Sequence, residues 1–164
     1  MKKGKVSGHS ILWAPWRKGY ILRAYKMKTC IFCAALRERK DKKNFIVRRS
    51  KHAFAILNLY PYNNGHVMIV PNRHSDRFQG LRDDELLDLM HLQNEVLSLL
   101  EKKIKPHGIN LGVNLGRTAG AGIAGHLHIH IVPRWTGDTN FMPLIGRVKV
   151  ISESLSSLYA RLTE

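Results

Sequence analysis

The sequence from His126 to Arg134 reads HLHIHIVPR, so three histidines alternate with aliphatic residues. Strict alternation of this kind is typical of a half-buried β-strand, in which residues two positions apart point to the same face. The strand then presents His126, His128 and His130 in one row and turns the aliphatic residues toward a core. Imidazole titrates near a pH of about 6.5, so adjacent rings are costly unless their nitrogens have partners or a task. The row predicts the reactive edge of an enzyme.

The chain has 164 residues, of which 44% are hydrophobic, and this suits one domain with one core. No apolar run approaches the roughly 20 residues that span a bilayer. The basic N-terminus is not followed by the apolar stretch of a secretory signal, so we expect a cytoplasmic location and no membrane partner. We expect residues 1–29 to form an extension that wraps over the body, and residues 30–164 to form a single domain.

The net charge is +15, from 27 Lys and Arg against 12 Asp and Glu. Such a field attracts polyanions such as a nucleotide polyphosphate or a nucleic acid. A solvated lysine-rich surface explains the same charge, and charge alone favours that explanation slightly. No stretch interleaves base-stacking aromatic residues with arginines, so we expect no dedicated nucleic-acid module.

The remaining patterns predict a sheet of about five short strands with one long helix. We expect strands at residues 44–49, 53–59, 66–70, 108–115 and 126–134, and helices at 31–40, at 83–104 and from 152. Pro71 should stop the third strand. Because short connections join most neighbouring strands, the sheet should be mainly antiparallel, and the fold class should be α+β.

A glycine-rich segment, GRTAGAGIAG at residues 116–125, leads into the histidine row. Glycine lets a backbone approach a ligand closely, and successive N–H groups can bind an anion. A phosphate bound there would lie beside the imidazoles, where a neutral ring can attack phosphorus and form a phosphoramidate. Three alternatives remain: a flexible hairpin connection, a zinc or non-haem iron site on the histidines, and three satisfied surface histidines.

The chain has two cysteines, Cys30 and Cys33, in a CxxC arrangement. A redox pair usually follows a parallel strand in a βαβ unit, and no such strand is predicted before Cys30. The pair could instead be half of a tetrahedral metal site, which needs two more ligands from elsewhere. Two reduced, inert thiols are the third interpretation.

Several motifs together resemble the histidine triad family, and in particular its bacterial branch with diadenosine tetraphosphate phosphorylases. The matching segments are LWAPWRKGYI, CIFC, AILNLYPYNNGHVMIVPNRH, NLGRTAGAG and HLHIHIVPRWTGDTNFMP, and the resemblance extends over about residues 12–151. It implies an α+β histidine triad fold, with a mainly antiparallel sheet of about five strands, one long helix and a C-terminal helix. It also implies a two-fold homodimer whose sheets align across the interface.

The resemblance assigns roles to individual residues. The catalytic triad is His126, His128 and His130, in which His128 matches the nucleophile that becomes nucleotidylated and His130 matches the neighbour that contacts the α-phosphate. The matching substrate-binding positions are Asn58 at the ribose, His66 in support of the active strand, and Asn114, Gly116, Gly120 and Gly122 at the phosphates.

The resemblance also suggests a closed structural zinc site formed by Cys30, Cys33, His74 and His126, and no organic cofactor. A zinc ion on His126 would prevent that ring from acting as an acid or base. The chain departs from better-known members shortly before the triad. They carry Gln followed by Ser or Thr, whereas this chain has Gly-Ile-Ala at residues 122–124. The side-chain donor to the leaving group is therefore missing, and the candidate substitutes are backbone N–H groups, Thr118 or Arg117.

These observations predict a nucleotidyltransferase or hydrolase that cleaves phosphoanhydride or phosphoramidate bonds. The expected substrate is a dinucleoside polyphosphate such as diadenosine tetraphosphate, cleaved through a covalent nucleotidyl-histidine, with phosphate or water as the acceptor. Two other interpretations are a nucleotide-binding scaffold with low turnover or activity on adenylylated compounds, and a metal-dependent enzyme that uses the triad as ligands.

Overall fold

The computed structural model describes residues 29–140, 142 and 150–164. Its centre is one five-stranded antiparallel sheet with the order β1-β2-β3-β5-β4. The strands are β1 Ile46–Arg49, β2 Ala53–Leu57, β3 Val67–Pro71, β4 Gly108–Val113 and β5 Ile129–Arg134. The prediction of an α+β fold with about five antiparallel strands is confirmed.

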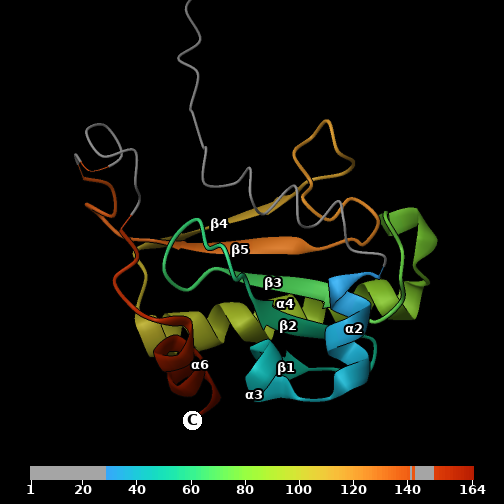
Figure 1. Ribbon diagram of the computed structural model, residues 1–164, viewed down its shortest axis with the longest axis horizontal. Helices are drawn as coiled ribbons and strands as arrows, with labels where there is room; N and C mark the ends of the chain where they lie inside the picture. The colour runs from blue at the N-terminus through green and yellow to red at the C-terminus, as the bar shows by residue number, and fades with distance from the viewer. Residues whose placement is uncertain (1–28, 141, 143–149) are drawn as a thin grey trace, which may run out of the picture.

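The helices lie around this sheet (Figure 1). They are α2 Ile31–Glu38, α3 Asp41–Asn44, the short 3-10 helix η1 Phe78–Gly80, α4 Asp83–Ile104 and α6 Leu155–Thr163. The long helix α4 covers one face, and α2 lies on the other. The predicted extension at residues 1–29 lies outside the described residues except for Thr29, so the division at residue 29 stays a prediction.

The strands bury side chains on both faces because helices cover both. In β2, Ala53, Ala55 and Leu57 join the cluster under α4, whereas Phe54 and Ile56 join the cluster under α2. In β3 the residues alternate in the same way, and every residue of both strands is buried. The histidine row therefore enters a sheet that has no solvent-facing side at its centre.

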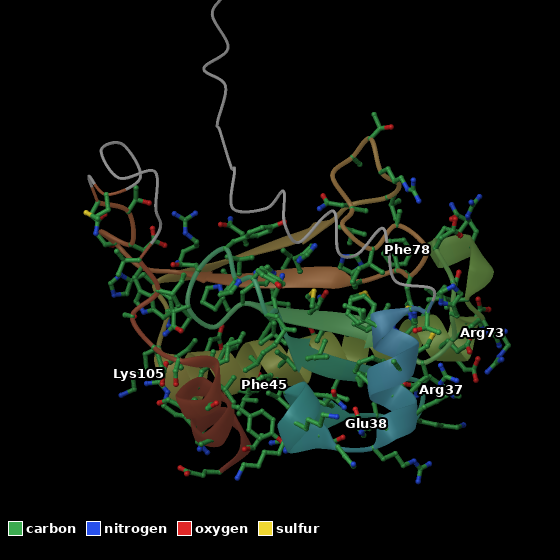
Figure 2. The ribbon with its side chains drawn as sticks, in the orientation of Figure 1. Arg37, Glu38, Phe45, Arg73, Phe78 and Lys105 are labelled. Carbon is green, nitrogen blue, oxygen red and sulfur yellow. The ribbon has the colours of Figure 1, made fainter. Side chains whose placement is uncertain are left out.

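Helix α4 packs through a stripe at helical spacing: Leu89, Leu92, Val96 and Leu100 are buried. The Glu85 carboxylate accepts the Arg82 backbone N–H at 2.9 Å and two hydrogen bonds from Arg73, which lies near the start of α4 (Figure 2). Lys102 and Lys103 occupy its last turn, where the helix dipole favours cations. Among the described helices, none combines the length and the apolar character needed to cross a bilayer.

Most element boundaries differ from the sequence prediction by a few residues, and three of the differences concern the site or its surroundings. Residues 41–44 form α3 and not the start of a strand, and Phe45 follows it at φ 57°, packed 5.9 Å from the ring of Tyr159 in α6 (Figure 2). Pro71 does not stop β3 but ends it as a paired residue opposite Ala53. Strand β5 begins at Ile129, so of the three histidines only His130 lies within a regular strand.

The turn between β2 and β3 ends at Gly65, where a side chain would need a left-handed backbone and would press on two neighbouring side chains. Its φ is +76°, and a Cβ there would lie 2.5 Å from Ile104 Cδ1 and 3.0 Å from Pro133 Cγ. Gly137 has the similar φ of +78° but open space around it. The two glycines separate the cost of backbone strain from the cost of a steric clash.

We expect Gly65→Ala to destabilise the protein by about 2–5 kcal/mol, the sum of left-handed backbone strain and overpacking. Gly137→Ala should cost only the strain, about 1–2 kcal/mol. Urea unfolding of both variants measures the difference. Equal midpoints for the two would show that the contacts of Gly65 with α4 and β5 relax without cost.

Candidate functional site

The three histidines of the row are all buried, with exposed fractions of 1% for His126, 5% for His128 and 8% for His130. The sequence predicted a half-buried strand, but α2 covers the histidine side as well. The ring of Phe32 in α2 lies 5.3 Å from that of His128 and 5.4 Å from that of His126. The intervening Leu127 and its aliphatic neighbours face the α4 cluster, as predicted.

The ring of His128 is held by the backbone of its own segment. Its Nδ1 lies 2.8 Å from the carbonyl oxygen of His126, which can only accept, so Nδ1 carries the proton. In the neutral ring Nε2 then keeps its lone pair. Burial lowers the pKa of His128 below its ordinary value, which favours this neutral form at pH 7.

His130 has the opposite arrangement, which a chain of hydrogen bonds sets. The Tyr62 backbone N–H can only donate, and it lies 3.0 Å from His66 Nδ1. A neutral His66 therefore carries its proton on Nε2, which lies 2.9 Å from His130 Nδ1. His130 Nδ1 accepts a hydrogen bond from the Nε2–H of His66, so a neutral His130 carries its own proton on Nε2. The two neighbouring histidines thus present a lone pair at His128 Nε2 and an N–H donor at His130 Nε2.

These two histidines open into a small cavity of about 30 Å³. It brings together the predicted positions Asn58, Asn114, Gly120, Gly122, His128 and His130, together with Tyr60, Tyr62 and Met68. His66 is buried at an exposed fraction of 1%, and its Nε2 lies 2.9 Å from His130 Nδ1; its supporting role stays a prediction. Gly116 does not line this cavity, and neither does His126.

An apolar cavity of about 140 Å³ adjoins the small one. The two share Asn58, Tyr60 and Met68. Its other walls come from α2, from residues 43–45 and from β2: Ile31, Phe32, Ala35, Lys43, Asn44, Phe45, Ile56, Leu57 and Leu59. Such a space, mostly apolar with a few polar groups at one end, is typical of sites for flat organic rings.

His126 turns its side chain away from the cavity and into a cluster with Cys30, Cys33 and His74. The Nδ1 atom of His126 lies 3.2 Å from Cys30 Sγ, 3.6 Å from Cys33 Sγ and 3.2 Å from His74 Nδ1. Cys33 Sγ lies 3.4 Å from His74 Nδ1. All four candidate ligand atoms lie within 4.8 Å of one another.

These spacings fit the ligand shell of a tetrahedral ion. With Zn–S at about 2.3 Å and Zn–N at about 2.0–2.1 Å, tetrahedral angles give S···N near 3.5 Å and N···N near 3.3 Å. His126 Nε2 lies 2.9 Å from the carbonyl oxygen of Pro71 and donates to it, so Nδ1 offers its lone pair to the cluster. Burial lowers the pKa of His126 to about 4, which keeps the ring neutral as a ligand must be. Burial and the neighbouring Cys30 raise the pKa of the Cys33 thiol, which favours its protonated form when no cation is bound.

Several residues of this site were not predicted from the sequence, among them Tyr62 and Phe32. Tyr62 lies in a segment that resembles the family, but it was given no role, and its ring lies 4.8 Å from that of His66 and 5.7 Å from that of His130. Phe32 stands between the two cysteines and packs on the histidine row. The helical position of Phe32 was readable from the sequence, but its contact across the sheet was not.

Comparison with known proteins agrees with this fold and site. The HIT domain model matches residues 39–137. The chain is 39% identical over 151 residues to the AP-4-A phosphorylase of Mycobacterium tuberculosis, covering 88% of this chain and 77% of that protein. It is 37% identical over 120 residues to an uncharacterised HIT-like protein of Methanocaldococcus jannaschii, covering 73% and 89%.

Among solved structures, a hypothetical histidine triad nucleotide-binding protein of Sulfolobus tokodaii superposes with a TM-score of 0.67 and 28% identity, covering 82% of this chain and 89% of that one. The chain belongs to the HIT domain family, and the resemblance seen in the sequence is confirmed.

The hydrogen bonds predict two different tautomers for neighbouring histidines. In nitrogen-15 NMR spectra at neutral pH, we expect His128 to be protonated on Nδ1 and His130 on Nε2. The exposed His91 should show the solvent-averaged pattern and serves as the reference. If both buried rings carried the proton on the same nitrogen, the two histidines would not divide the roles of lone pair and donor between them.

Proposed function

We propose that this protein is a nucleotidyltransferase or hydrolase that cleaves dinucleoside polyphosphates through a covalent nucleotidyl-histidine. The observation that carries the proposal is the opposite protonation of two adjacent rings: His128 Nε2 offers a lone pair and His130 Nε2 offers a proton. A nucleophile beside a hydrogen-bond donor, both at the wall of one small cavity, is what attack on a phosphoryl group requires.

The proposed reaction has two steps that balance in atoms and charge. His128 Nε2 attacks the α-phosphorus; the P–N bond forms as the bond from the α-phosphorus to the bridging oxygen breaks, and the leaving polyphosphate keeps the electron pair. Phosphate or water then attacks the same phosphorus, the P–N bond breaks with its electron pair going to Nε2, and the neutral ring returns. The proton of the attacking water or hydrogen phosphate passes to solvent. His130 donates its Nε2 hydrogen bond to an α-phosphate oxygen, where negative charge gathers.

Other residues position the substrate in this proposal. Asn58 holds the ribose at the border between the two cavities, and the apolar cavity takes the base. Asn114, Gly120 and Gly122 line the cavity of His128 and surround the phosphates, whereas Gly116, the fourth predicted position, lies outside that lining. His126 serves the triad through its backbone carbonyl and not as an acid or base, because its ring faces the cysteines. His66 holds the tautomer of His130.

The name of the M. tuberculosis relative supports diadenosine tetraphosphate as the first substrate to test. One sequence feature favours a second candidate, a nucleotide-binding protein with low turnover or with activity on adenylylated compounds. Residues 122–124 lack the Gln and the Ser or Thr that better-known members carry before the triad. The same assay separates the two candidates.

We expect purified protein to convert diadenosine tetraphosphate to ADP and ATP when phosphate is the acceptor. With water as the acceptor, we expect AMP and ATP. His128→Ala should lose at least about 1,000-fold in kcat, because the nucleophile is gone. His130→Ala should lose about 100- to 1,000-fold, as for one transition-state donor. Product chromatography measures the turnover of both variants. An alkaline quench followed by mass analysis should find an adenylyl group on the wild type and none on His128→Ala.

His91→Ala is the matched control, because His91 is an exposed histidine on α4 outside the site. Its turnover should equal that of the wild type. Full turnover by His128→Ala would rule out the covalent mechanism. Tight nucleotide binding by the wild type without products would favour the low-turnover candidate.

We further propose that the cluster of Cys30, Cys33, His74 and His126 holds a structural zinc ion. The distances and the donor set of two thiols and two imidazoles support this. When bound, the ion would supply folding energy by joining the segment before α2 to the residues that precede β5. Four protein ligands would leave no open position, so the ion has no direct part in the reaction.

Metal analysis should find about one zinc per chain. Cys33→Ser should lose most of the metal and lower the melting temperature, because a hydroxyl is a poor zinc ligand. The control is Ser98→Ala, which alters an exposed residue on α4. It should keep the zinc content and the melting temperature of the wild type. The assignment would be contradicted if Cys33→Ser kept one zinc ion per chain and melted at the same temperature as the wild type.

A homodimer with aligned sheets is also proposed, as the family resemblance implies. Strand β4 is at the edge of the sheet, and its Leu111 side chain has an exposed fraction of 50%. An exposed edge strand with an apolar side chain is suited to pairing with a second copy.

A further inference from the structure

The site contains a third cavity, of about 240 Å³. It shares Gly122 with the small histidine cavity, which in turn shares Asn58, Tyr60 and Met68 with the apolar cavity. The small cavity, which alone of the three is lined by His128, therefore lies next to both larger ones. The two larger cavities have only Ile31 in common, and they differ sharply in their chemistry.

The middle cavity, at about 30 Å³, is the smallest of the three. A nucleoside bound at the apolar end would bring its α-phosphate to His128. Further phosphates would then continue past Gly122 into the third cavity. The order of the cavities fixes the direction of the chain: base, α-phosphate, then the departing group.

The lining of the third cavity is suited to negative charge. It consists of Thr29, Cys30, Ile31, His74, Arg117 and residues 121–125, and none of these carries a carboxylate. The backbone N–H groups of residues 122–125 donate no hydrogen bond to another described residue. Such N–H groups, successive in a glycine-rich loop, are donors suited to phosphate oxygens.

Arg117 is the one permanent cation in this lining. His74 faces the cysteines, and two thiolates would neutralise a divalent ion held there. Arg117 is also an exposed residue of the glycine-rich loop. Thr118, another candidate substitute for the missing side-chain donors, does not line the cavity.

We propose that this cavity binds the polyphosphate part of the substrate and that Arg117 determines selectivity for polyphosphate leaving groups. The inference rests on the proposed nucleotidyl transfer at His128 and adds the site of the departing group. As the bond to the bridging oxygen breaks, charge grows on the leaving phosphate. Arg117 and the loop N–H groups then take the place of the side-chain donors that this chain lacks.

The test compares two substrates that share the nucleotidyl part and differ in the leaving group. Diadenosine tetraphosphate releases a polyphosphate, whereas adenosine 5′-phosphoramidate releases ammonia. The measurement is the ratio of their kcat/KM values at fixed ionic strength. For Arg117→Gln we expect this ratio to fall at least about tenfold, the loss of one charge-assisted hydrogen bond. Arg117→Lys should fall less, because the charge remains.

Arg48→Gln is the matched control, since it removes an exposed arginine on β1 outside these cavities. Its ratio should equal that of the wild type. In a second measurement, inorganic tripolyphosphate should inhibit the wild type competitively and inhibit Arg117→Gln at least about tenfold more weakly.

An unchanged ratio in Arg117→Gln, whether both activities stay or fall together, would overturn the assignment of this cavity while leaving the nucleotidyl transfer intact. A wild type that cleaves neither substrate would overturn the proposed function, and this inference with it. An equal fall in the ratio for Arg48→Gln would show that net charge acts, and not this site.

Discussion

The site depends on the interactions that His126 makes through its backbone carbonyl and through its imidazole ring. Its backbone carbonyl accepts a hydrogen bond from His128 Nδ1 at 2.8 Å, and its ring reaches Cys30, just before α2, and Cys33, within α2. The same ring donates to the carbonyl of Pro71 at the end of β3. One residue thereby connects three parts of the chain and sets the tautomer of the neighbouring ring. Because the ring of His126 contacts the cysteines and Pro71, only His128 and His130 of the three histidines line the cavity.

A second hydrogen-bond chain, from Tyr62 through His66 to His130, acts from the opposite side of the row. It begins at a backbone N–H, which cannot change its role, and so it gives His130 a definite proton position. Backbone groups thus define both rings. Side chains alone would leave each imidazole free to exchange tautomers, and the two rings would no longer present one lone pair and one N–H donor.

The sequence predicted much of this molecule. Alternation in HLHIHIVPR correctly turned Leu127, Ile129 and Ile131 toward the core, and the periodicity of residues 83–104 gave α4 with its observed bounds. It failed where tertiary contacts decide. Nothing local shows that Phe32 covers the histidine face, that Pro71 pairs within β3, or that the regular strand starts only at Ile129. The tautomers and the adjoining cavities depend on segments far apart in the chain, so no pattern within one segment could reveal them.

The order β1-β2-β3-β5-β4 places β5 beside a strand made much earlier in the chain. His66 and His130, which must meet for the second ring to take its proton, are 64 positions apart. Contacts of such separation form late, because a long loop has to close before they contribute. A chain emerging from the ribosome therefore has the walls of its apolar cavity well before it has the histidine row. Under the proposed mechanism, catalytic competence arrives only when synthesis has passed β5, and half-made copies of this protein leave the cell's nucleotides untouched.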